Sequence, residues 1–113
     1  MLLQNNLYHI IAHDDSAYTI RFNASHPIFA GHFPGFPIVP GACLVQIAQE
    51  LLSDNLCASV ALTGIHNLKF RHPITPDMDV VYRFDGNKIT IQDLESTIHA
   101  SFSAFYMRTH SDV

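Results

Sequence analysis

Residues 42–55, A-C-L-V-Q-I-A-Q-E-L-L-S-D-N, form the most informative stretch of this chain. The stretch contains neither proline nor glycine, and its apolar residues recur at spacings that cover more than one face of a helix. Pro40 and Gly41 mark the predicted start of this helix, and the polar run 53–55 marks its end. We therefore expect a helix that is buried on most sides. The apolar positions are Leu44, Val45, Ile47, Ala48, Leu51 and Leu52.

The segments on both sides of this helix have the patterns of β-strands. In residues 17–23, Tyr18, Ile20 and Phe22 alternate with polar side chains, which is typical of a strand with one covered face. Asp85-Gly86-Asn87 is a strong hairpin signal, and Gly64 marks a possible bulge. The predicted strands are residues 7–12, 17–23, 59–70, 80–84, 88–94 and 98–107.

The order of these elements predicts an α+β fold. Two strands precede one buried helix, and four strands follow it. A helix that is apolar on most sides needs a sheet that curls around it. This is the hot-dog fold, a curved antiparallel sheet wrapped around one long central helix. At 113 residues, we expect residues 1–113 to be a single domain.

Composition excludes several classes of function. The formal net charge is −4 and the six Lys and Arg residues are scattered, so a nucleic-acid-binding surface is not expected. No apolar run reaches the roughly 20 residues that span a membrane. Cys43 and Cys57 would lie ~20 Å apart along one helix, too far for a disulfide. Free thiols and an N-terminus without signal-peptide features indicate the cytoplasm. No cofactor is expected, and the eight histidines show no metal-ligand spacing.

The loop before the helix carries the most specific motif. Residues 24–41 hold four of the six prolines and three of the five glycines, yet the segment is also apolar, so we expect it to pack against the body. Residues 31–41, G-H-F-P-G-F-P-I-V-P-G, match every fixed position of G-H-F-P-G-x-P-x-x-P-G. This is the signature of the bacterial β-hydroxyacyl-ACP dehydratases of fatty-acid synthesis, which the chain resembles. The resemblance continues at residues 68–77, where Asp77 stands in place of a glycine.

This resemblance implies a set of site residues. His32 would abstract the α-proton of a β-hydroxyacyl thioester, since histidine titrates near neutrality. The backbone N–H of Gly41 would hold the thioester carbonyl at the positive end of the helix. Gln46 occupies the position of the family's helix acid. The product would be the trans-2-enoyl thioester, carried by an acyl carrier protein through phosphopantetheine, or by CoA. The implied substrate-binding residues are Phe33, Gly35, Pro40 and Ala42.

Gln46 is a departure from the family, because an amide cannot deliver a proton to the leaving hydroxyl. Three interpretations remain open. His32 carries the proton alone while Gln46 orients the hydroxyl. Alternatively, Glu50, four residues further along roughly the same helix face, reaches the site, although a partly exposed helix-end carboxylate is the simpler expectation. In the third interpretation the protein is not a dehydratase, but a thioesterase or a non-catalytic acyl-binding partner subunit.

Two surface features point to partners. Lys69 and Arg71 should project from the same strand face, either as a solvated face or as a basic patch for an acidic carrier protein or its phosphate. A sheet wrapped on one helix also leaves a strand edge and a helix flank uncovered. Such surfaces are usually covered by a partner, so we expect at least a homodimer.

Overall fold

The computed structural model describes residues 2–30 and 37–109. Within these residues the strands form one antiparallel sheet in the order β1-β2-β4-β5-β6-β3. A short 3-10 turn and one long helix complete the fold. The elements are β1 (Tyr8–His13), β2 (Ala17–Phe22), η1 (Pro27–Phe29), α1 (Gly41–Leu56), β3 (Val60–Phe70), β4 (Asp79–Asp85), β5 (Lys88–Gln92) and β6 (Ile98–Arg108).

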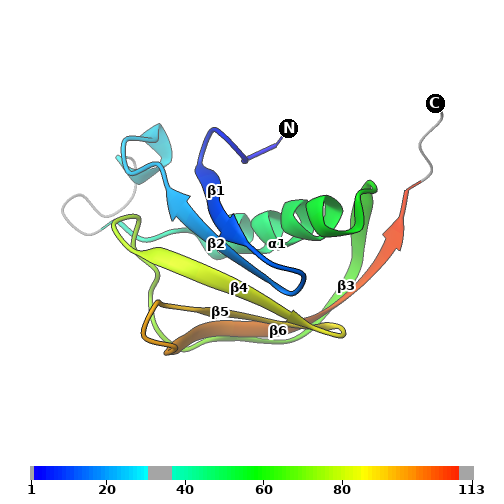
Figure 1. The fold of residues 1–113 in the computed structure, drawn as a ribbon. Helices are drawn as coiled ribbons and strands as arrows, with labels where there is room; N and C mark the ends of the chain where they lie inside the picture. The colour runs from blue at the N-terminus through cyan, green and yellow to red at the C-terminus, as the bar shows by residue number, and fades with distance from the viewer. Residues whose placement is uncertain (1, 31–36, 110–113) are drawn as a thin grey trace.

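The sheet curves around α1, which lies along its concave side (Figure 1). The α+β hot-dog architecture predicted from the element order is therefore confirmed. The ends of the predicted elements differ from the observed ones by one or two residues. The turn between β4 and β5 is the predicted hairpin, with Gly86 at a φ of +59°. Such a φ favours glycine because it has no Cβ.

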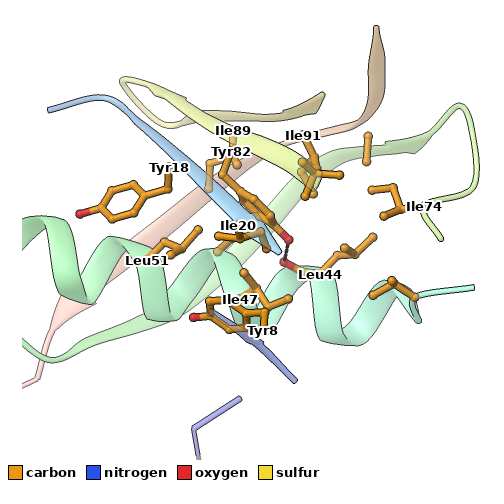
Figure 2. Close-up of a cluster of buried hydrophobic side chains, with 14 of the residues drawn as sticks. Tyr8, Tyr18, Ile20, Leu44, Ile47, Leu51, Ile74, Tyr82, Ile89 and Ile91 are labelled. Atoms are coloured by element: carbon orange, nitrogen blue, oxygen red, sulfur yellow. Dashed lines mark hydrogen bonds between the residues drawn. The ribbon is translucent and has the colours of Figure 1, made fainter. Parts of the chain in front are cut away.

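The core lies between α1 and the concave face of the sheet. Ile47, Ala48 and Leu51 of the helix are completely buried. Figure 2 shows Tyr82 reaching from β4 toward the helix, where its hydroxyl donates a hydrogen bond of 2.8 Å to the carbonyl oxygen of Leu44. This contact fixes the N-terminal half of α1 against the sheet. The apolar side of β2, predicted from alternation, is also buried: Tyr18, Ile20 and Phe22.

Strand β3 forms an edge of the sheet, since β6 is its one neighbour among the described strands. Its register with β6 shifts between Leu62 and Gly64, where the sequence predicts a bulge. A second shift falls between His66 and Lys69. Three apolar side chains of this edge strand are at least one-third exposed: Ile65, Leu68 and Phe70.

The two cysteines are both free thiols, with Cys43 half-buried and Cys57 exposed. This confirms that they do not pair with each other. Across residues 2–30 and 37–109, the structure contains no helix with the length and apolar character needed to span a membrane.

The Tyr82 contact generates a test of the fold. Tyr82→Phe removes the hydroxyl that bonds the Leu44 carbonyl, and we expect the free energy of unfolding to fall by about 1 kcal/mol. Chemical denaturation followed by circular dichroism measures this loss. Tyr106→Phe is the matched control, because the Tyr106 hydroxyl forms no hydrogen bond among the described residues. Equal losses in the two variants would contradict a clamping role for Tyr82.

Candidate active site

The N-terminus of α1 presents uncapped backbone donors. Pro40 is the N-cap, in an extended conformation with φ −60° and ψ 142°, and it offers no side-chain cap. Its carbonyl accepts the N–H groups of Cys43 and Leu44. For the N–H groups of Gly41 and Ala42, no acceptor is found in the part of the chain that the structure describes. Such a helix start favours a negatively charged oxygen.

An apolar cavity of about 310 Å³ opens at this helix start, between α1 and the segment that follows β3. The backbone N–H of Val39 donates to the carbonyl of Ile74 at 2.8 Å and joins the two walls. Leu44 and Ile74, labelled at the N-terminal end of α1 in Figure 2, are buried at its base. A thioester and an acyl chain fit an apolar lining of this kind. The lining residues are Ile38, Val39, Gly41, Leu44, Phe70, Arg71, His72, Pro73 and Ile74.

Phe70 covers the helix start. A Cβ built on Gly41 would lie 2.9 Å from Cζ of the Phe70 ring, so a larger residue at position 41 would displace the ring. Phe70 is 53% exposed, which gives its ring room to move. Gly41 therefore allows a large aromatic side chain to lie against the first turn of α1, beside the uncapped N–H groups.

Glu50 is buried, with 6% exposure, so the expectation of a partly exposed carboxylate is wrong. Its Oε1 accepts the Gln4 N–H and the Tyr8 hydroxyl, both at 2.9 Å. Its Oε2 accepts the Leu3 N–H at 2.8 Å and the Gln46 side-chain amide at 3.0 Å. Burial, followed by the hydrogen bond to Glu50, raises the pKa of Tyr8 above its usual range. The N-terminal segment thus supplies the donors that keep this carboxylate inside the protein.

This network separates Glu50 from the cavity at the helix start. All four contacts use the carboxylate as an acceptor, and Glu50 borders a different depression, next to Gln4 and Ser53. The geometry does not support Glu50 as a substitute acid at the cavity. The amide of Gln46 is directed toward Glu50, one turn beyond the helix start.

The structure brings together only part of the predicted site. Gly41 lines the cavity, Pro40 precedes it as the N-cap, and Ala42 is exposed in the first turn. Gln46 is half-buried and is not among the described residues that line the cavity. The predicted residues His32, Phe33 and Gly35 lie outside the described residues.

A buried histidine supports the wall of the cavity opposite the helix. His99 Nδ1 lies 3.1 Å from the Pro73 carbonyl oxygen, and Nε2 lies 3.0 Å from Asp93 Oδ2. The His99 carbonyl accepts the Arg71 N–H at 2.7 Å. The hydrogen bond from His99, helped by the backbone N–H of Thr97, lowers the pKa of the Asp93 carboxyl. These contacts attach the segment after β3 to β6.

Three features of this site were missed from the sequence. The helical period places Glu50 one turn after Gln46 and beside the buried Leu51, a signal that could have predicted its burial. Nothing in the local pattern indicates that Phe70 meets Gly41, because that contact depends on how β3 curves. The Asp93–His99 pair likewise forms across a turn between β5 and β6 and has no local signature.

The fold is that of the hot-dog proteins, and the helix start with its apolar cavity is a site suited to an acyl thioester. A family model described as "ApeI-like: ApeI dehydratase" matches residues 9–104. The chain belongs to this family of dehydratases.

Curated relatives are similar in sequence, and a solved structure has the same fold. A 3-hydroxyacyl-[acyl-carrier-protein] dehydratase FabZ of Acetivibrio thermocellus is 37% identical over 59 residues, which cover 46% of this chain and 40% of the relative. The FabZ of Campylobacter curvus is 36% identical over 72 residues, covering 52% of this chain and 49% of the relative. The chain therefore spans about half the length of the curated relatives it matches. The dehydratase heterocomplex ApeI:P from Xenorhabdus doucetiae has the same fold, with a TM-score of 0.65, 18% identity, and coverage of 88% of this chain and 95% of that one.

The lowered pKa of Asp93 predicts a pH-dependent stability. Because the folded-state pKa lies below the ordinary 3.8, the contribution of Asp93 is present above that value and is lost as the pH falls through the folded pKa. We expect Asp93→Asn to be less stable than wild type at neutral pH. The difference should shrink below about pH 4. Urea unfolding at a series of pH values measures this. Glu95→Gln changes the charge equally two residues away, and an identical pH profile in that variant would contradict the assignment.

Proposed function

We propose that this chain acts in the cytoplasm as a 3-hydroxyacyl-thioester dehydratase. It would remove water from a β-hydroxyacyl group to give the trans-2-enoyl thioester, in fatty-acid or in polyene or polyketide-type synthesis. The observation that carries the proposal is the pair of uncapped N–H groups, of Gly41 and Ala42, at the mouth of an apolar cavity. Membership of a dehydratase family supports the same reaction.

The chemistry follows from charge development on the substrate. The thioester oxygen accepts a hydrogen bond from the Gly41 N–H and gains negative charge when the α-proton leaves. His32, the base implied by the motif, takes that proton. The carbon–oxygen bond at the β-carbon then breaks, and the departing hydroxide takes the proton from His32 as water forms. Gln46 orients the hydroxyl, while Phe33, Gly35, Pro40 and Ala42 contact the substrate.

The proposal includes an acyl carrier and a second protomer. The FabZ relatives are named as acting on carrier-bound acyl groups, which supports a phosphopantetheine-linked substrate, with acyl-CoA as the alternative. The edge strand β3, with its exposed apolar side chains, supports at least a homodimer.

A second candidate is a non-catalytic partner subunit of a heteromeric dehydratase. Two observations favour it: Gln46 occupies the position of the helix acid and bonds to Glu50, and a solved structure of the same fold is named as a dehydratase heterocomplex. The discriminating experiment incubates the purified chain with 3-hydroxyacyl-ACP and follows enoyl product and free thiol in parallel. Enoyl formation supports the dehydratase, thiol release indicates a thioesterase, and neither product favours the partner subunit.

His32→Ala tests the base. We expect dehydration to fall by about 10²–10⁴-fold, the usual contribution of a general base. Steady-state turnover of 3-hydroxyacyl-ACP provides the measurement. Circular dichroism and sedimentation of the variant check that fold and assembly are retained. Activity within a few-fold of wild type would remove His32 from the mechanism.

Gln46→Glu tests the missing acid. The substitution is isosteric and places a new carboxyl about 3 Å from the Glu50 carboxylate, in place of the present amide. Burial and a like charge both raise carboxyl pKa values, so the pair should retain a proton at neutral pH. We expect dehydration to rise about tenfold or more, because a neutral carboxyl can protonate the leaving hydroxyl. The same repulsion should lower the free energy of unfolding.

Gln46→Ala is the control for this substitution, since it removes the amide without adding an acid. An unchanged rate in Gln46→Glu, in a chain that does dehydrate, would show that His32 moves the proton alone. Full activity in Gln46→Ala would show that Gln46 has no part in the chemistry.

A further inference from the structure

Half of the positive side chains of this chain lie around one depression on the outer face of the sheet. The depression has a volume of about 240 Å³ and is lined by three cations, Lys69, Arg71 and Lys88, together with the hydroxyls of Ser101 and Ser103. Lys69 and Arg71 were predicted to share a face, and both do line it. Lys88 is distant in the sequence and joins them only in the folded protein.

The strand register explains this convergence. Lys69 of β3 pairs with Ser101 of β6, and Lys88 of β5 pairs with Ser103 of the same strand. The intervening Phe102 is buried on the helix side. Ser101 and Ser103 therefore face outward, between two lysines supplied by the neighbouring strands. The side chains that can donate hydrogen bonds therefore come from β3, β5 and β6 and line the same depression.

Among the described residues, no carboxylate forms an ion pair with the cations of this depression. The ion pair Arg21–Asp79 and the Asp93–His99 hydrogen bond, both found among the described residues, include no cation of the depression. The carboxylate nearest in register is Asp85, opposite Lys88, and the two do not form an ion pair. On a chain of net charge −4, this concentration of free donors is a local exception.

We propose that this depression binds the phosphate group of a phosphopantetheine arm. Phosphate oxygens accept several hydrogen bonds at once, and ammonium, guanidinium and hydroxyl donors are the groups that supply them. The small volume fits one phosphate rather than a polynucleotide. The position identifies the arm, because Arg71 lines both this depression and the apolar cavity at the start of α1. With its phosphate beside Lys69 and Lys88, the pantetheine arm would extend past Arg71 into the cavity that Gly41 lines.

This inference deepens the proposed function, and its test does not depend on turnover. Pantetheine and 4′-phosphopantetheine differ only in the phosphate, so their affinities for the intact protein are compared by calorimetry. We expect phosphopantetheine to bind about tenfold more tightly, the worth of one charge-assisted contact. Amide chemical shifts of Ser101 and Ser103 should move on addition of phosphopantetheine but not of pantetheine.

Lys69→Ala and Lys88→Ala should each reduce that preference several-fold, and the double variant should abolish it. Arg83→Ala is the matched control: it removes one exposed positive charge on β4 and should leave the preference unchanged. Equal affinity for the two compounds in wild type, or a preference that survives the double variant, would overturn the phosphate site. If wild type prefers phosphopantetheine but shows no dehydratase activity, the phosphate site is supported and only the proposed function is refuted.

The source of the phosphate is identified with two further ligands. Phosphopantetheine attached to a carrier protein and CoA carry the same arm phosphate. A larger loss for the carrier in the double variant supports a carrier-borne arm, and a larger loss for CoA supports a CoA-borne arm. No loss for either ligand would contradict the site.

Discussion

The burial of helix α1 against one continuous curved sheet is the constraint on which the rest of this structure depends. The helix carries apolar residues on more than one face, so a flat sheet would leave part of it in water. Curvature, assisted by the bulges in β3, brings β2, β4 and β5 over the same helix. Tyr82 then fixes the N-terminal half of the helix against the sheet by donating a hydrogen bond to the Leu44 carbonyl. As a result the first turn of α1 has a fixed position at the mouth of the curved sheet.

This fixed helix serves two purposes along its length. Its first turn, without a side-chain cap, directs N–H donors into the apolar cavity beside Phe70. Further along the helix, Glu50 accepts the backbone N–H groups of Leu3 and Gln4, and the side-chain amide of Gln46 donates to the same carboxylate. The first turn of the helix therefore presents donors for binding, and later turns attach the N-terminal segment. The wall opposite is held separately, by His99 between Pro73 and Asp93.

The fold was largely predictable because its signals are periodic and local. Alternation in β2, the hairpin at Gly86 and the apolar faces of α1 each appear within a few consecutive residues. The site was predictable only where a local signal marks it, as Pro40 and Gly41 mark the helix start. Glu50 was wrongly predicted to be partly exposed: the helical period places it beside the buried Leu51, but the donors that stabilise its buried carboxylate lie more than forty positions away in the chain. Lys88 joins Lys69 through strand register, which no single segment encodes.

The contact between Gln46 and Glu50 has a consequence for the evolution of this family. A buried carboxylate at position 50 and an acid at position 46 would stand one helical turn apart and repel each other. The two positions should therefore vary together among homologues, with an acid at one matched by an amide or apolar residue at the other. A lineage that adopted the buried anchor at 50 would therefore recover an acid at 46 only with a loss of stability. A change in the N-terminal segment that offsets this loss would favour the recovery, so the order of substitutions is influenced by the electrostatics of a single pair.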